Sequence, residues 1–296
     1  MKLVAVTITR NDDWSLGLAL RSALRWCDAV VVLDHASEDS TPDLLSQLSK
    51  DYPGRVVRLS EPNTGRWSEM DNRQRTLEAA RNLNASHVAI VDSDELLTDN
   101  LIAGVRDRIA QAEPGITYGL PQVSAYHSLV RRRVDGPWGR TSTWSLAFRL
   151  TPDVHWRADD GYHLHHRQPY GANQCRHLIP GDEFFRLNLG GVIHLQHSSY
   201  RRLRAKAVWY KLLETVSYPG RRDPAFLNRM YDWTLRTENA EVVDLPGEWW
   251  GENRPLAEAY LDLAKTPWQE SEARRLWQEH GAAKFAGIDL HGLVLD

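Results

Sequence analysis

The sequence contains little cysteine and no long hydrophobic run. Two cysteines, Cys27 and Cys175, stand in 296 residues, too few for a disulfide framework and not at metal-site spacing. A reducing cytoplasm is therefore the expected compartment. The apolar start at residues 1–6 is too short for a signal peptide, and no stretch approaches the length of a membrane span. We expect a cytoplasmic protein with no transmembrane segment.

The chain also lacks an excess of charge of one sign. It has 36 Lys and Arg against 39 Asp and Glu, a net charge of -3, so no overall field favours nucleic acid. The 42% hydrophobic and 25% charged residues are typical of a globular protein that forms one large domain, alone or with an appendage. Twelve tryptophans are many for this length, and their planar rings suit a core, a sugar face or a nucleobase.

Strand and helix patterns alternate in the first half of the sequence. Predicted strands cover residues 3–9, 29–34, 56–59 and 88–91, and predicted helices cover 13–24, 41–50 and 71–83. This alternation predicts a mainly parallel sheet, in which ligands bind beyond the carboxyl ends of the strands. Residues 9–11, 34–37 and 92–94 should therefore lie along one rim.

The second half is less regular. Residues 116–125, 142–150 and 190–197 are predicted strands, and 199–213 form a basic, aromatic helix. Arg131–Arg133 and the following Gly/Pro segment indicate a hairpin or loop, and the histidine-rich residues 155–177 lack periodicity. From Arg221 onward the tail is mostly helical.

The most informative motif is Asp92-Ser93-Asp94-Glu95, directly after the apolar run 88–91. Three carboxylates within four positions repel one another unless a cation lies among them. Their oxygens suit Mg²⁺ or Mn²⁺, ions that usually also hold substrate phosphates. The alternative interpretation is an acidic N-cap for a helix over residues 96–112.

Other strand ends carry matching polar residues. Asp34 at the end of the second strand can accept an N–H of uracil or guanine, or a ribose hydroxyl, and the small Ala36 and Ser37 leave room for a flat base. Arg73 or Arg75 can bind phosphate, because a guanidinium group can donate two parallel hydrogen bonds to phosphate oxygens. The alternative interpretation of the Asp34 segment is a turn rich in helix-capping residues. The alternative for the two arginines is that they form ordinary surface salt bridges.

Together these segments resemble a known family. Residues 6–11, 33–41, 73–77 and 91–95, in this order, are similar to the nucleotide-sugar half of family 2 glycosyltransferases of the GT-A fold. Looser similarity extends through Phe148, Trp156 and residues 197–200. The resemblance implies an α/β fold: a GT-A-like, Rossmann-type mixed and mainly parallel sheet, flanked by helices, with a helical C-terminal extension. It implies metal-dependent transfer of a sugar from a nucleoside diphosphate sugar, with a UDP-sugar favoured, to an acceptor hydroxyl.

Site residues follow from the resemblance position by position. The donor nucleotide sugar would be bound by Thr7, Arg10, Asp34, Asp39, Arg66, Arg73, Asp92 and Ser93. Mn²⁺ or Mg²⁺ would be held by Asp94, with Asp92 and a later histidine. His194 and His197 are three apart, a spacing that points them to opposite faces of one strand. We favour His197, because it stands at the strand's carboxyl end, and both can serve only if the strand ends between them.

The catalytic base is less well defined. Related sequences often have His-Glu after the tryptophan of a late strand, whereas here the segment reads Trp156-Arg157-Ala158-Asp159-Asp160. An inverting enzyme needs a carboxylate base, for which Asp160 or Asp159 is the first choice and Asp182 and Glu183 are rivals. A retaining enzyme would need no base there, and both outcomes remain open.

The expected organisation has three parts: a nucleotide-sugar-binding half over 1–115, an acceptor-binding and catalytic half over 116–215, and a helical extension over 216–296. The acceptor is unidentified, and a glycan, a lipid-linked sugar, a small molecule and modified nucleic acid all stay open. The basic segments 131–133 and 201–206 either contact an acidic acceptor or form solvated faces. Alternative functions are a nucleotidyl- or phosphotransferase on the same carboxylates, and a non-catalytic module that binds nucleotide or glycan.

Overall fold

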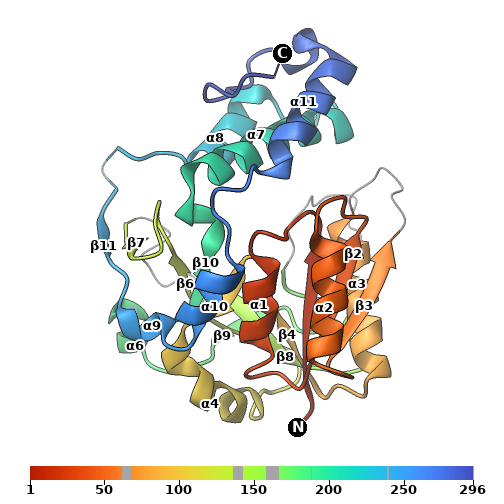
Figure 1. Cartoon of the computed structure of the whole chain (residues 1–296), viewed down its shortest axis with the longest axis vertical. Helices are drawn as coiled ribbons and strands as arrows, with labels where there is room; N and C mark the ends of the chain where they lie inside the picture. Colours follow the sequence, from red (N-terminus) through yellow and green to blue (C-terminus); the bar gives the residue numbers. More distant parts are fainter. Residues whose placement is uncertain (62–67, 136–142, 158–166, 188, 239, 296) are drawn as a thin grey trace.

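The computed structural model describes residues 1–61, 68–135, 143–157, 167–187, 189–238 and 240–295 (Figure 1). Its centre is one curled sheet, whose strands in spatial order are β3 (Val56–Glu61), β2 (Ala29–His35), β1 (Leu3–Thr9), β4 (His87–Ile90), β8 (Thr143–Arg149), β6 (Ile116–Ser124), β10 (Val192–His194) and β5 (Glu95–Leu97), with β9 (Gln174–His177) beside β6. Only β8 and β5 pair antiparallel with their neighbours among these described strands. The predicted fold class, a mixed and mainly parallel sheet flanked by helices, is confirmed.

Helices cover both faces of the sheet because its strands alternate their side chains. Leu3 and Ala5 of β1 point to one face, where α1 (Leu16–Ala23), α2 (Thr41–Asp51) and α4 (Asp99–Ile109) pack. Val4 and Val6 point to the other face, against α3 (Glu69–Asn82). The carboxyl ends of the parallel strands are thereby left uncovered by these four helices.

The C-terminal helices divide into two groups. A separate core joins α7 (Tyr200–Ser217), α8 (Pro224–Asp232), α11 (Trp268–His280) and the short η2 (Ala282–Phe285), which stand above the strand ends at the top of Figure 1. The chain between α8 and α11 instead returns to the sheet, where α9 (Gly247–Trp250) and α10 (Asn253–Tyr260) pack against α1, β5 and β10.

Three local predictions need correction. The helix expected over 96–112 begins only at Asp99, because residues 95–97 form β5; the acidic motif is therefore not its N-cap. The strand expected over 190–197 ends at His194, and residues 195–198 turn into the 3-10 helix η1 (Leu195–Ser198). The arginine run forms a strand, β7 (Arg131–Arg133), which pairs with β11 (Val242–Asp244).

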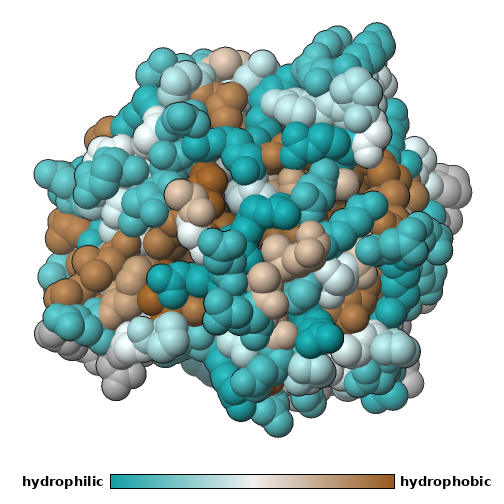
Figure 2. Space-filling view, turned by 90° about the horizontal axis from the view of Figure 1, so that it is seen from below, coloured by the Kyte–Doolittle hydropathy of each residue, from teal (hydrophilic) through white to brown (hydrophobic). Residues whose placement is uncertain are grey.

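Residues 182–187 form the short helix α6 (Asp182–Leu187). Within the described ranges, no helix has both the length and the apolar character needed to cross a membrane. Seen from below, the described surface intersperses small hydrophobic patches with hydrophilic side chains (Figure 2).

Candidate active site

A cavity of about 330 Å³ lies between the strand ends and the C-terminal helices. It brings together seven of the side chains predicted to form the site: Arg10, Arg73, Asp92, Ser93, Asp94, His194 and His197. The first four helices leave the carboxyl ends of β1 and β4 open, and α7, α8 and α11 close the space above them. The cavity is thus where the strand-end rule places a ligand site.

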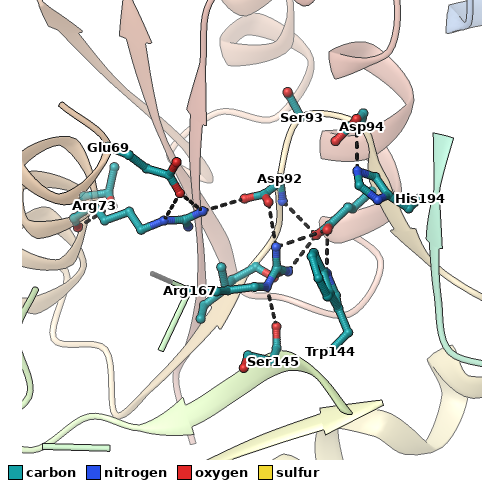
Figure 3. A network of polar contacts seen from close by, with 12 residues as sticks. Glu69, Arg73, Asp92, Ser93, Asp94, Trp144, Ser145, Arg167 and His194 are labelled. Carbon is teal, nitrogen blue, oxygen red and sulfur yellow. Dashed lines mark hydrogen bonds and ion pairs between the residues drawn. The ribbon is translucent and has the colours of Figure 1, made fainter. Parts of the chain in front are cut away.

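Asp92 is held between two guanidinium groups (Figure 3). Its Oδ1 lies 3.1 Å from a terminal nitrogen of Arg73 on α3, and its Oδ2 lies 2.6 Å from a terminal nitrogen of Arg167. Burial alone would raise the pKa of this carboxyl, but Arg167 and Arg73 outweigh it and hold the pKa well below its ordinary value. Asp92 is therefore an ionised carboxylate, and each of its oxygens is paired with one guanidinium group.

Arg167 also fixes the surrounding strands. Its guanidinium donates to the carbonyl oxygens of Ser145 on β8 (2.7 Å) and Ile90 on β4 (3.0 Å), and to Glu95 Oε2 on β5 (2.6 Å). The same group lies 4.8 Å from the ring centre of Trp144, whose indole N–H donates to Glu95 Oε1 at 2.6 Å. One side chain thus links three strands beneath the acidic motif.

Asp94 points away from the arginines and toward His194 (Figure 3). The Asp94 Oδ2 to His194 Nε2 distance is 3.3 Å. Burial raises the pKa of Asp94, but the neighbouring His194 has the opposite effect and outweighs it, so the pKa falls to about 2. The other ring nitrogen of His194, Nδ1, lies 2.6 Å from the side-chain amide of Gln122, which orients the ring.

His197 faces the same cavity as His194. Because β10 ends at His194 and the chain turns through η1, the two rings lie 5.1 Å apart, centre to centre, instead of on opposite faces of a strand. Burial, reinforced by His194, keeps the pKa of His197 well below its ordinary value, so the ring is neutral at pH 7. Both histidines are placed to act beside Asp94.

Asp12 is a cavity carboxylate that the sequence analysis did not single out. Ser93 Oγ donates to its Oδ2 at 2.6 Å, and Thr9 Oγ1 donates to the same oxygen at 3.2 Å. Burial, with a smaller effect from Asp94, raises its pKa to about 6. Its position just after the first strand was an available signal, because that segment was already assigned to the rim.

The C-terminal helices contribute further residues, and two of them, Arg202 and Lys206, belong to the basic segment 201–206 identified in the sequence. Arg202 of α7 stacks 3.9 Å from the ring centre of Trp14, and Arg10 lies 5.4 Å from that of Trp268 on α11. Lys206 Nζ donates to Gln196 Oε1 at 2.6 Å. The basic, aromatic character of residues 199–213 and the number of tryptophans were the sequence signals for this wall.

Three residues that were predicted to bind the donor nucleotide sugar lie outside the described lining of the cavity. Asp34, at the end of β2, pairs with Arg58 at 3.1 Å and accepts the backbone N–H of Ser37 at 3.0 Å. Asp39 accepts the backbone N–H of Thr41 at 2.9 Å. Thr7 is buried within β1.

The remaining predicted residues are less informative. Arg66, Asp159 and Asp160 lie outside the described residues. Asp182 is the first residue of α6, and Glu183 is exposed on that helix and does not contribute to the described cavity lining.

A second group of potential ligands lies among the C-terminal helices. Among the described residues, Asp232, Asp289 and His291 are the ones whose ligand atoms approach within 4.8 Å of one another. However, the buried ammonium of Lys211 donates to Asp232 Oδ1 at 2.6 Å and to the Asp289 carbonyl at 2.5 Å. A cationic side chain therefore already balances this acidic group.

Comparisons with known proteins agree with the family expected from the sequence. The glycosyl transferase family 2 model matches residues 5–171. Among solved structures, S. aureus TarS residues 1–349, also solved with UDP, is 14% identical, with 97% of this chain and 83% of that chain covered and a TM-score of 0.42.

Glucosyl-3-phosphoglycerate synthase from Mycobacterium tuberculosis, in complex with Mn²⁺, UDP and phosphoglyceric acid, is 23% identical, covering 42% of this chain and 43% of that chain with a TM-score of 0.30. No curated protein matches the chain. Because the family model spans more than half of its residues, the chain belongs to glycosyl transferase family 2 and is a glycosyltransferase.

Proposed function

We propose that the enzyme transfers a sugar from a UDP-sugar to an acceptor hydroxyl and depends on a divalent cation. The observation that carries this proposal is that the Asp92–Asp94 motif, two histidines and several arginine and lysine side chains line one cavity. A site for a diphosphate-linked donor needs these groups: a cation site, hydrogen-bond donors for phosphate and an enclosed space.

Asp94, His194 and His197 are the proposed metal ligands. Asp94 is ionised and His197 is neutral. With its amide oxygen turned toward His194, Gln122 accepts a hydrogen bond from Nδ1–H, which would leave Nε2 free for the ion. One carboxylate with two imidazoles fits Mn²⁺ better than Mg²⁺, which prefers oxygen. The bound cation would neutralise charge on the diphosphate.

Asp92 has a different proposed role. Each of its oxygens is paired with one arginine and keeps a second lone pair, so Asp92 could reach the ion only alongside these ion pairs. We assign Asp92 to the sugar or ribose of the donor, with Arg73 and Ser93 nearby, and keep it as a further ligand of the ion.

The nucleoside is assigned to the ends of β1 and β2. Thr9 and Asp34 are paired in the register of these strands, and Ser37 Oγ accepts the backbone N–H of Asn11 at 2.9 Å, so the two loops form one edge. A carboxylate can accept the imide N–H of uracil, and UDP is the proposed nucleotide. Arg10 and Arg66 are proposed to contact the nucleotide, while Thr7 and Asp39 shape this edge.

In the proposed reaction, the acceptor oxygen forms a bond to the anomeric carbon as the bond from that carbon to the diphosphate oxygen breaks. The diphosphate keeps the electron pair, and the acceptor proton passes to a carboxylate. Asp160 or Asp159 is proposed as that base, because both precede Arg167 closely in the sequence and Arg167 reaches Asp92.

The test combines binding and turnover. Thermal shift with UDP, GDP, ADP and CDP, each with and without Mn²⁺, should show the largest shift for UDP with the ion. UDP release from a panel of UDP-sugars should stop in chelator and fall about 100-fold or more in Asp94→Asn, with unchanged circular dichroism. Glu113→Gln, which changes an exposed residue, is the control.

Two outcomes would contradict the proposal. Full activity of Asp94→Asn or of the chelated enzyme would overturn the metal assignment, and stabilisation by nucleoside triphosphates alone would favour a nucleotidyltransferase.

A further inference from the structure

The cavity wall opposite the carboxylates is aromatic. We call this wall the aromatic roof; it consists of Trp209 and Tyr210 on α7, Tyr231 and Trp233 at the end of α8, and Trp268 at the start of α11. These residues pack on one another: the rings of Trp209 and Trp268 meet edge to face, with centres 4.8 Å apart. The roof is therefore a preformed surface.

The roof is fixed to the strand ends. Arg202, four residues before Lys206 on α7, stacks on Trp14, and its guanidinium donates to the carbonyl oxygens of Asp262 (3.2 Å) and Lys265 (2.6 Å). Lys265 in turn pairs with Asp13 in the loop after β1. The aromatic residues and the acidic motif thus form opposite walls of one site.

The charges that line the cavity are balanced. Among the described lining residues, four are cationic and four are anionic: Arg10, Arg73, Arg202 and Lys206 against Asp12, Glu69, Asp92 and Asp94. Arg73 is paired with Glu69 and Asp92, and Lys206 is bonded to Gln196. If a divalent cation offsets the donor diphosphate, this lining has no surplus positive charge for an acidic acceptor.

Uncharged hydrogen-bonding groups accompany the rings. Thr234 and Gln269 line the cavity beside the roof. Planar apolar faces with neutral donors at their edges match the C–H faces and hydroxyls of a sugar ring.

We propose that the aromatic roof is the acceptor subsite and that it takes an uncharged carbohydrate. This inference rests on the proposed function, because the cavity must also hold the donor diphosphate and its cation. The acceptor ring stacks on the roof and presents one hydroxyl toward the Asp92–Asp94 rim, where the donor's anomeric carbon would lie.

The experiment separates acceptor binding from donor binding. With the UDP-sugar that the wild type hydrolyses fastest, UDP release is measured alone, with maltose, cellobiose, lactose or N,N′-diacetylchitobiose, and with glucose 6-phosphate. The same series is run on Trp233→Leu and Trp268→Leu. Trp277→Leu is the matched control, because Trp277 also lies on α11 but stacks on Phe285 away from the cavity.

We expect at least one neutral disaccharide to accelerate UDP release. The two roof variants should lower the ratio of UDP release with the disaccharide to UDP release without it about tenfold, and Trp277→Leu should leave this ratio unchanged. Acceleration by glucose 6-phosphate alone would overturn the proposal, as would an equal loss of hydrolysis and transfer, which would place the donor on the roof.

A measurement on the unmodified enzyme avoids dependence on variants that fail to fold. Saturation-transfer NMR with UDP and Mg²⁺ should show contact of at least one disaccharide with the protein, and the absence of any transfer would also overturn the proposal. If the wild type releases UDP from no donor under any condition, the proposed function itself fails and this inference with it.

Discussion

At the scale of single residues, Arg167 shows how one cation stabilises two carboxylates, one buried and one partly buried. Glu95 is 1% exposed and Asp92 is held by two arginines. Replacing Arg167 with glutamine leaves these charges insufficiently compensated, so the free energy of unfolding should fall by about 3–5 kcal/mol. Urea unfolding monitored by circular dichroism measures this loss. In the control, Arg176→Gln breaks an ion pair that is more than half exposed and should change stability by less than about 1 kcal/mol; equal losses would contradict the argument.

Because of Asp12, the free energy of unfolding should decrease as the pH rises from about 4 to about 6. Its folded-state pKa of about 6 exceeds the ordinary value of 3.8 because the charged form is buried. The folded state therefore binds the proton more tightly than the unfolded chain, and stability decreases as pH rises through this window. Asp12→Asn keeps an acceptor for Ser93 and removes the charge. Its urea midpoint should exceed that of the wild type at pH 7.5, with a smaller difference at pH 4.5; a pH-independent difference would show that ionisation is not responsible.

Which site residues the sequence could predict depends on their distance from a strand end. Arg10, Asp92 and Asp94 directly follow strongly apolar strands, so the rim rule located them. Arg167 follows a segment without periodicity, and only the folded chain brings it to Asp92. The strand expected over residues 190–197 was three residues too long, because the chain turns into η1 after His194. This strand end between His194 and His197 is the condition under which both can serve one ion.

At the scale of elements, the pairing of β10 with β6 positions His194. Gly191 immediately precedes β10, and a Cβ at this residue would lie 2.0 Å from the carbonyl oxygen of Pro121 on β6. Gly191→Ala must therefore push the two strands apart, which should lower the urea midpoint and weaken Mn²⁺ binding measured by calorimetry. Gly104 on the exposed side of α4 has no atom within 4 Å of such a Cβ, so Gly104→Ala should stabilise the protein by about 0.5–1 kcal/mol. Unchanged ion binding in Gly191→Ala would separate His194 from the metal site.

Long elements were predictable and the shortest were not. The seven residues of β1 and β2 are buried throughout, which gives a clear apolar run, and α2 begins at the predicted Thr-Pro signal. By contrast β5, β7 and β11 have three residues each and were not predicted as strands, and the three residues of β10 were predicted as part of a longer strand. Such strands are too short to show a period, and their partners in the folded chain define them.

At the scale of the whole molecule, the cavity joins the two ends of the chain. The family model ends at residue 171, whereas the roof begins at Trp209 and ends at Trp268. No local pattern predicts this wall, because its rings come from three helices that meet only after folding. The acidic motif and Arg73 thus lie within the family match, whereas the aromatic roof and the two histidines beside Asp94 lie beyond it.

The links between these ends predict coupled protection on donor binding. Asp262 N donates to the Trp14 carbonyl at 2.8 Å, Arg202 binds the carbonyls of Asp262 and Lys265, and Lys265 pairs with Asp13. Ordering of residues 9–14 by UDP and Mn²⁺ should therefore also slow amide hydrogen exchange in residues 262–269, although those residues need not touch the nucleotide. Hydrogen exchange with mass spectrometry measures both segments, and residues 277–295 serve as the internal control. Lys265→Gln should weaken protection of 262–269 while sparing 9–14. Protection confined to 9–14 in the wild type would mean that the C-terminal helices open independently of the donor site.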